Sequence, residues 1–436
     1  MLINMKILSL RHITRIEGHL NFTVTIENGT VRARAEALEG TRLLERVFIG
    51  REYWEIPDIA SRMCGVCQAI HRLTAIQAIE NAFDILLPEE LEKLRKLVAV
   101  GGHLQSHIVH LFIFVLPDYM KSHSILEIAS KNRRLIRNFL RMKKIANRIT
   151  EMIGGRAVHP LTPVVGGLSK LPTRRVLELA LDLAKEFMRL AEETLRPIFL
   201  LEFPEFERRT NYLSLYNGKE YPLLRGSIKI FGKEEFKPED YEKYIKPITE
   251  DYSTARHYVL RSSGKEYAVG ALSRVNINHS LLSDSAMEVI KEYNLKYPSY
   301  SPFENNRAQA VEIIHFAEDM VNTLEDLIYR PPRFKKVDFK VKEREGVAAT
   351  EAPRGLLIHH YKINREGIIE RANIITPTAQ NYKCIEADAV AYTTKLLSER
   401  IGNIKGELEK LIRAYDPCVS CSARFFREHT LTRDSI

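Results

Sequence analysis

The amino-acid sequence predicts an α+β protein, mainly α, in which a bundle of long helices carries a small N-terminal antiparallel sheet and an inserted β and loop region. Three observations predict this architecture. Apolar and polar residues alternate near the N-terminus, with the period of β-strands. From Pro57 onwards, apolar residues recur at three- and four-residue spacing, as in amphipathic helices. Between about 203 and 275, a segment rich in Tyr, Pro, Gly and Lys interrupts the helical pattern.

The N-terminal sheet is expected at about residues 8–40. Its alternating runs are Ile13–Ile16, Leu20–Ile26 and Val31–Ala37, and Asn28-Gly29 separates the last two. An Asn-Gly pair between two such runs is typical of a tight hairpin turn. We therefore predict antiparallel strands in this part of the chain.

Helical patterns account for most of the remaining chain. A hairpin is expected at Leu356–Tyr361 and Ile369–Ile375, and Asp416-Pro417 ends the last helix because proline cannot continue one. Since no repeat or low-complexity linker is visible, a single domain over residues 1–424 is the most economical interpretation. The expected helices cover Pro57–Phe83, Pro88–Leu116, Ile125–Ile153, Thr173–Phe199, Asn305–Tyr329 and Cys384–Tyr415.

Composition is typical of a globular protein with a substantial core: hydrophobic residues make up 45% of the 436 residues and charged residues 28%. The net charge of +9 comes from separated basic clusters, which favour solvated helix faces or a surface for an acidic partner subunit over nucleic-acid binding. The longest apolar stretch, Ile108–Pro117, has only about half of the roughly 20 residues that a membrane span needs. No signal peptide is apparent. We expect a cytoplasmic protein with no direct membrane insertion.

Four of the five cysteines form two CxxC pairs, Cys64 with Cys67 and Cys418 with Cys421. The first pair lies near a predicted helix start, where the partial positive charge lowers a thiol's pKa, and the second follows a helix end. Four soft thiolates suit nickel, zinc, copper(I) or an iron–sulfur cluster. A metal or redox site is therefore expected.

Two simpler interpretations of the cysteines stay open on spacing alone. One is a structural zinc site, although zinc modules place their cysteine pairs within a few tens of residues, and Cys67 and Cys418 are 351 positions apart. The other is a dithiol redox pair at either CxxC, although neither pair follows a strand in a βαβ pattern.

Three further residues are candidates beside such a site. His71 follows Cys67 by one helical turn and could donate to a sulfur, although a lone helical histidine is more often a packed core residue. Glu17 lies in a polar break between predicted strands, where a surface glutamate is the simpler interpretation. Arg354 precedes an apolar strand, where an ordinary salt bridge is the simpler interpretation.

Together these residues resemble the [NiFe] hydrogenase large-subunit family. The motifs are Arg62-x-Cys64-Gly-x-Cys67-x-x-x-His71 and Asp416-Pro-Cys418-x-x-Cys421, and the resemblance extends over nearly the whole chain. It is closest to the α subunits of cytoplasmic NADP-linked hydrogenases (sulfhydrogenases) of heat-loving archaea. Supporting segments lie at 15–19, 45–51, 106–118, 154–160, 351–355 and 376–378, and those at 270–274, 301–309 and 374–381 carry the narrower likeness.

The resemblance implies a role for each cysteine. Cys64 and Cys418 would be terminal nickel ligands. Cys67 and Cys421 would bridge nickel to an iron that carries carbon monoxide and two cyanides. The residues implied around this centre are His71, Pro353, Arg354, Thr378 and Asp416.

The resemblance also implies the reaction. H2 would be split heterolytically, with a terminal thiolate or Arg354 taking the proton, and Glu17 relaying it from Cys418. Electrons would pass to the iron–sulfur clusters of a small subunit, and on to flavin and NAD(P) subunits with further clusters.

The chain departs from the family's pattern at two positions. Ser106 stands where many members carry an acid, and Arg424 stands where many carry a histidine that binds an inner magnesium ion. Glu45 and the carbonyl of Ile374 correspond to the other ligands of that ion. The family's maturation endopeptidase would cut after Arg424, so 425–436 is expected to be a removable extension.

Other functions remain as alternatives. One is the large subunit of a ferredoxin-linked, membrane-bound hydrogenase complex. The others are non-catalytic: a quinone-site subunit like that of respiratory complex I, whose relatives lack the cysteine quartet, or a zinc-binding homologue.

Overall fold

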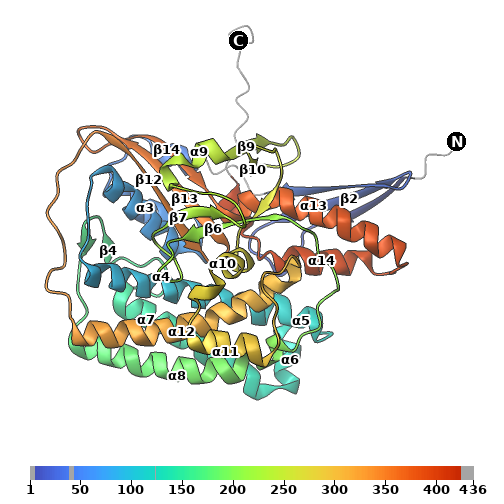
Figure 1. The fold of residues 1–436 in the computed structure, drawn as a ribbon, viewed down its shortest axis with the longest axis horizontal. Helices are drawn as coiled ribbons and strands as arrows, with labels where there is room; N and C mark the ends of the chain where they lie inside the picture. Colours follow the sequence, from blue (N-terminus) through green and yellow to red (C-terminus); the bar gives the residue numbers. More distant parts are fainter. Residues whose placement is uncertain (1–4, 39–43, 123, 424–436) are drawn as a thin grey trace, which may run out of the picture.

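A computed structural model describes residues 5–38, 44–122 and 124–423 of the chain. Four long helices form a bundle in the lower part of the view in Figure 1. α4 packs against α7, α7 against α8, α8 against α12, and α12 against α4. The bundle helices are α4 (Glu89–Val109), α7 (Arg133–Gly154), α8 (Arg174–Phe199) and α12 (Asn305–Tyr329).

The sequence predicts α8 and α12 closely, but it predicts a single helix, Ile125–Ile153, where the structure has two. The structure has α6 (Ile125–Lys131) and then α7. Between them, the side chain of Asn132 accepts a hydrogen bond from the backbone N–H of Leu135 and so caps a new helix. α4 continues through a π-helical stretch (His110–Val115) into α5 (Leu116–Tyr119).

The N-terminal sheet is confirmed, with one correction. Its strands are β1 (Met5–Leu10), β2 (Leu20–Glu27) and β3 (Thr30–Ala37), in that order. The predicted strand at Ile13–Ile16 is wrong, since the first strand lies earlier in the chain. Asn28 and Gly29 both have positive φ, as the tight turn between β2 and β3 requires.

A second antiparallel sheet lies against the helix that follows the first cysteine pair. It consists of β12 (Arg344–Ala352), β13 (Gly355–Ile363) and β14 (Ile369–Ile375). The sequence predicts the β13–β14 hairpin and misses β12. α3 (Gln68–Ala82) packs on β12 and β13, and nearly all of its residues are buried.

The inserted region is shorter than predicted. Its strands end at Ala268, and α10 (Ala271–Asn278) begins inside the range assigned to it. Two small sheets have the orders β11-β6-β7-β8 and β10-β9. The elements are β6 (Asn211–Tyr216), β7 (Ser227–Ile230), β8 (Glu235–Phe236), α9 (Tyr241–Tyr244), β9 (Ile245–Thr249), β10 (Arg256–Leu260) and β11 (Tyr267–Ala268).

The predicted last helix is two helices, α13 (Pro377–Ser398) and α14 (Ile404–Ala414). Arg400 adopts a positive φ between them, and the side chain of Asn403 caps α14 at the N–H of Gly406. The predicted first helix is likewise α2 (Ile56–Ser61) and α3, separated by the loop that carries the first cysteine pair. The remaining short elements are α1 (Leu44–Phe48), β4 (Pro163–Val164), β5 (Gly167–Leu168), α11 (Asp284–Glu292) and α15 (Val419–Ser422).

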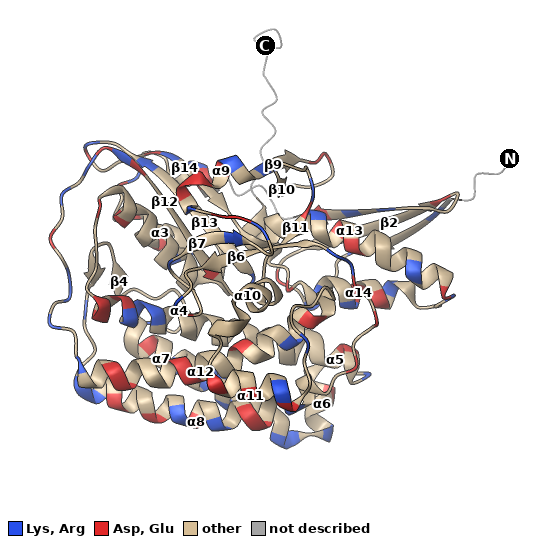
Figure 2. Ribbon diagram, viewed as in Figure 1, with Lys and Arg blue, Asp and Glu red and all other residues tan. Residues whose placement is uncertain are grey.

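Among the described residues, one helical segment, Glu89–Tyr119, is long and apolar enough to cross a membrane, and 83% of its apolar part is buried inside the protein. Most of this segment is α4, which packs against α7 and α12 in the bundle. Basic and acidic residues are mixed along α8 and α11, whereas the charged residues of α7 are mostly Lys and Arg and those of α12 mostly Asp and Glu (Figure 2).

Candidate metal centre

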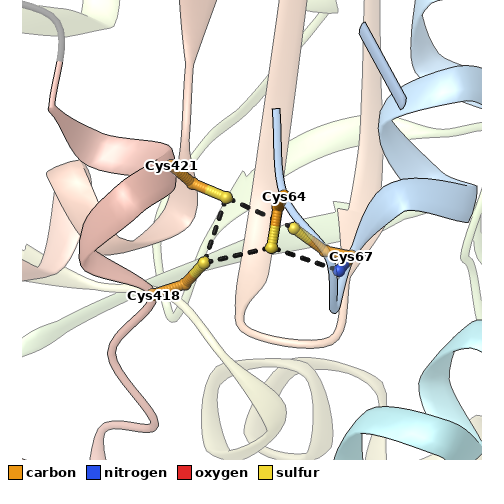
Figure 3. Close-up of side chains that lie close together, drawn as sticks. All are labelled: Cys64, Cys67, Cys418 and Cys421. Carbon is orange, nitrogen blue, oxygen red and sulfur yellow. Dashed lines mark hydrogen bonds between the residues drawn. The ribbon is translucent and has the colours of Figure 1, made fainter. Parts of the chain in front are cut away.

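The two CxxC pairs meet at one place, as predicted. Cys64 and Cys67 come from the loop before α3, and Cys418 and Cys421 come from the chain around α15 (Figure 3). Their sulfur atoms lie 3.3 Å apart for Cys64 and Cys418, 3.5 Å for Cys67 and Cys421, and 3.0 Å for Cys418 and Cys421. All four sulfurs are within 4.8 Å of one another, and all four residues are buried. Two sulfurs bound to one ion at about 2.3 Å lie at most about 4.6 Å apart, and the three measured pairs, at 3.0 to 3.5 Å, are within this limit.

Backbone hydrogen bonds from the N-terminal part of the chain hold the second pair in place. The N–H of Val419 donates to the carbonyl of Glu17 at 2.9 Å, and the N–H of Glu17 donates to the carbonyl of Pro417 at 3.4 Å. The N–H of Cys418 donates to the hydroxyl of Thr378, at the start of α13, at 2.9 Å. Glu17 from the N-terminal part of the chain and Thr378 from α13 thus fix the backbone around Cys418.

The thiols perturb one another strongly. Burial raises the pKa of Cys418 and Cys421 well above the usual value, whereas thiol hydrogen bonds, that from Cys418 foremost, lower the pKa of Cys67 well below it. Four buried thiolates together would be uncompensated without a cation. A soft metal ion provides that compensation, and sulfur is the donor that such an ion prefers.

Glu17 lies beside this group rather than on an unrelated part of the surface. Its Oε2 accepts from the Cys418 thiol at 3.0 Å and from the N–H of Ser420 at 3.2 Å. Its Oε1 accepts from the Ser420 hydroxyl. Glu17 is partly exposed, whereas the four cysteines are buried.

Arg354 lies in the turn between β12 and β13 and pairs with Asp416. Its Nε donates to the Asp416 carbonyl at 2.6 Å, and its Nη2 donates to Oδ1 at 2.8 Å. Although burial lowers the pKa of Arg354, the carboxylate of Asp416 and the nearby thiolates raise it further, so the guanidinium stays charged. Its Nη1 is buried without a hydrogen-bond partner in the described part of the chain, which leaves one donor for a group held by the cysteines.

His71 does not donate to a sulfur as predicted. Its Nδ1 instead pairs with Nε2 of His359 at 3.2 Å, and Nδ1 of His359 pairs with the Tyr361 hydroxyl at 2.6 Å. The Nε2 of His71 is buried and has no hydrogen-bond partner within the described ranges. The residue lies near the site, since its electrostatic interaction with Cys67 is one of the causes that lower the pKa of that thiol.

The residues expected around a magnesium ion are only partly brought together. Oε1 of Glu45 accepts a hydrogen bond at 3.0 Å from the N–H of Ile374, so the two residues are neighbours. The predicted magnesium ligand was the carbonyl of Ile374, whereas the group that contacts Glu45 is the N–H of Ile374. Glu45 itself is partly exposed. Arg424 and the extension 425–436 lie outside the described residues.

The sequence interpretation misses a buried ionic network behind the turn that carries Arg354. Arg274 of α10 pairs with Glu312 of α12 and Glu351 of β12, and all three are fully buried. Burial raises the pKa of Glu351 to about 7, against the lowering effect of Arg274. A signal for Glu312 exists, since it is a charged residue inside an otherwise apolar helical face, but its partners are distant in sequence.

Cys384 stands apart from the quartet, as predicted, although its surroundings are polar rather than apolar. Its sulfur contacts Nη2 of Arg208 and the hydroxyl of Tyr415, both at 3.2 Å. Burial nevertheless raises the pKa of this thiol to about 12.

Comparisons with known proteins agree with this geometry. The α subunits of sulfhydrogenase 1 and sulfhydrogenase 2 of Pyrococcus furiosus are 34% and 31% identical to this chain. The matches cover 96% and 97% of the chain, and 98% and 100% of those relatives. The crystal structure of an NAD+-reducing [NiFe]-hydrogenase in the H2-reduced state superposes with a TM-score of 0.86 at 25% identity, over 96% of this chain and 99% of the other. The model of the nickel-dependent hydrogenase family matches residues 42–138 and 233–424. The chain therefore belongs to the nickel-dependent hydrogenase family.

Proposed function

We propose that this chain is the catalytic subunit of a [NiFe] hydrogenase that cleaves H2 reversibly into protons and electrons. The observation that carries the proposal is the meeting of four buried cysteine sulfurs with a carboxylate, Glu17, hydrogen-bonded to one of them. A structural zinc site needs the sulfurs but has no use for an acid at a ligand's sulfur.

The residues present fit a nickel–iron centre. Cys64 and Cys418 would hold nickel as terminal ligands, and Cys67 and Cys421 would bridge it to iron. The free Nη1 donor of Arg354 suits cyanide ligands on that iron, in a pocket completed by Pro353 and Thr378. When bound, the centre supplies the site for H2 and accepts its electrons.

The chain's own residues would then move the proton. A proton on the Cys418 sulfur can pass to Glu17 over their 3.0 Å hydrogen bond. Since the environment raises the pKa of Arg354, its guanidinium keeps its proton and has no free site that could accept another. This favours the thiolate as the first acceptor, with Arg354 held as a fixed positive charge.

Electrons would leave to a small subunit that carries iron–sulfur clusters. The metal-binding loop reaches the surface at Arg62 and Gly65, which are exposed on either side of Cys64. Trp54, which precedes α2 and this loop in the chain, is 59% exposed. Nδ1 of His159 pairs with the Ser61 carbonyl at 2.8 Å and so links the neighbouring exposed residues Val158 and Leu161 to the loop. A cluster-bearing subunit seated here would lie closest to the metals.

Further electron transfer would run through flavin and iron–sulfur subunits to NAD(P), in a cytoplasmic complex. The likeness to an NAD+-reducing enzyme supports this direction over the ferredoxin-linked, membrane-bound alternative. Purification of the chain with its partners decides between them, since a flavin subunit and antiporter-like membrane subunits are readily told apart.

Metal analysis and infrared spectroscopy of the purified complex test the main proposal. We expect one nickel per catalytic chain and iron in excess of nickel, because the partner subunits carry iron–sulfur clusters. Infrared bands from carbon monoxide and cyanide and H2-dependent reduction of an artificial acceptor are also expected. Zinc alone, with no such bands and no turnover, would show the quartet to be a structural site.

A further inference from the structure

Arg274 is the most completely bonded charged side chain behind the candidate metal centre. It is fully buried on α10 and is among the largest buried side chains of the described residues. Its Nε and Nη2 donate to the two oxygens of Glu312 at 2.6 and 2.7 Å. Its Nη1 donates to Oε2 of Glu351 at 3.1 Å. Two carboxylates from different elements therefore hold the guanidinium in one orientation.

The remaining donors of Arg274 point to the turn between β12 and β13. Nη1 donates to the carbonyl of Ala352 at 2.9 Å, and Nη2 donates to the carbonyl of Pro353 at 3.0 Å. These are the two residues immediately before Arg354. The backbone from which the Arg354 side chain extends is thus attached to a rigid, buried group.

Close packing on the other side of the turn leaves it little freedom. A Cβ atom on Gly355 would lie 2.6 Å from the backbone nitrogen of Gly270, and Gly355 has φ +125. The turn therefore rests directly on the residue before α10, the helix that carries Arg274. The hydrogen bonds of Arg274 and the contact between Gly355 and Gly270 together connect α10 to the backbone around Arg354.

We propose that Arg274 is a positioning residue that sets the place of Arg354 over the cysteine quartet. The inference rests on the proposed function, in which the guanidinium of Arg354 faces the bound metals. Lysine at position 274 keeps the positive charge for Glu312 and Glu351, but a single ammonium cannot hold both carboxylates and both carbonyls. With that hold lost, a shift of Arg354 by about 1 Å is expected, and misplacement on this scale costs roughly 10²-fold in rate.

The chain offers a matched control in the pair of Arg95 and Glu80. Arg95 is also buried, makes two bonds to its glutamate at 2.7 Å, and donates to the carbonyls of Val164 and Gly167. Its surroundings are β4 and β5 rather than the Arg354 turn. Arg95→Lys therefore measures how much turnover falls when a buried arginine away from the Arg354 turn loses its hydrogen bonds.

A double-mutant cycle tests the proposal in the assembled enzyme. We expect Arg274→Lys to lower H2 turnover about 10²-fold while nickel and iron remain bound, and Arg95→Lys to change turnover much less. In an Arg354→Lys background, Arg274→Lys is expected to cause no further loss, because it acts through Arg354. Losses that multiply in the double variant, or wild-type turnover in metal-loaded Arg274→Lys, would overturn the proposal.

Hydrogen exchange provides a readout that needs neither catalysis nor metal. The backbone amides of Ala352 and of residues 354–356 are expected to exchange faster in Arg274→Lys than in the wild type, and to be unchanged in Arg95→Lys. Unchanged exchange in Arg274→Lys would refute the positioning role, even if the variant fails to load metal. A wild-type enzyme without H2 turnover would refute the proposed function instead, and exchange would still decide the role of Arg274 in holding the turn.

Discussion

The carboxylate of Glu17 lies 3.0 Å from the thiol sulfur of Cys418, although the two residues are 401 positions apart in the sequence. A second bond of that carboxylate, from the N–H of Ser420, holds it in the same place. An acid at this distance from a buried thiol is arranged for proton transfer, and it links the quartet to the partly exposed edge of the protein.

Glu17→Gln is expected to lower H2 turnover at least about 10²-fold while leaving nickel and iron bound. The amide keeps the shape of the side chain but loses the exchangeable acid. Turnover and metal content of the same preparation measure the two effects. Glu36→Gln, on β3 and bonded to Thr23, is the control and is expected to retain full turnover. Full activity in Glu17→Gln would remove this residue from the proton path.

Replacing any one of the four clustered cysteines by serine is expected to abolish nickel binding, because an alcohol is a harder and much less acidic ligand than a thiol. Cys384→Ser is the matched control. Its thiol has a pKa of about 12 and no place in the cluster, so that variant is expected to bind nickel normally. Metal analysis of the five variants gives the result. Nickel loss in Cys384→Ser alone would contradict the assignment.

The elements that the sequence predicts well are those with a strong local signal. The β2–β3 turn has Asn28 and Gly29, and α12 has an uninterrupted helical period, so both appear with nearly the expected bounds. The helix boundaries that were missed, at Asn132 and Arg400, depend on a side-chain cap or a single positive φ inside an otherwise helical pattern. Those local signals are weaker than the surrounding periodicity.

Some residues of the candidate site can likewise be predicted from the sequence, and others cannot. The cysteine spacing and the family likeness identify the quartet, because the ligand types and motifs are visible in the sequence. The hydrogen-bond partners of His71 and Arg274 are not visible in the sequence. The packing of β13 brings His359 to His71, and the packing of α12 brings Glu312 to Arg274. Tertiary contacts of this kind leave no pattern in one sequence.

Arg424 is expected to compensate the charge of Glu45 in place of the family's magnesium ion. A guanidinium has only donors and cannot bind a cation, but it can pair with a carboxylate. Because Glu45 is partly exposed and also accepts from Ile374, losing Arg424 is expected to cost less than the roughly 3–5 kcal/mol of a fully buried pair. Arg424→Ala is expected to reduce nickel loading more than Arg424→His, which can recruit Mg2+. A mature structure with Mg2+ on Glu45 and Arg424 turned away would contradict this prediction.

The segment after Arg424 is expected to be removed once nickel is in place. The second cysteine pair must stay open to accept the metal, and a C-terminal extension can hold it open until then. Charged residues such as Arg427, Glu428 and Asp434 make the extension unsuited to a core. In mass spectrometry of the active enzyme, the chain is expected to end at Arg424. In the nickel-free Cys418→Ser variant, the chain is expected to retain the extension. An intact Ile436 in active enzyme would show that no processing occurs.

Stability in acid is expected to depend on buried histidines, of which His257 on β10 is the clearest case. Both of its ring nitrogens lack hydrogen-bond partners among the described residues, and its ring stacks on Tyr382 at 4.8 Å. Burial, and then the charge of Lys383, lower its pKa to about 3. The carboxylate of Glu386 at 4.0 Å is therefore no ion-pair partner, because the imidazole is neutral.

The sign of the pH dependence follows from that lowered pKa. The unfolded chain binds a proton at His257 near pH 6.5 and the folded chain does not until about pH 3, so stability falls as the pH drops between these values. The slope from this one residue approaches about 1.4 kcal/mol per pH unit. His257→Phe keeps the ring on Tyr382 and removes the titration, so its stability relative to the wild type is expected to rise as pH falls from 6.5 to 4. Denaturant unfolding at several pH values measures the difference, and a difference that is constant over this range would show that His257 is protonated in the folded protein.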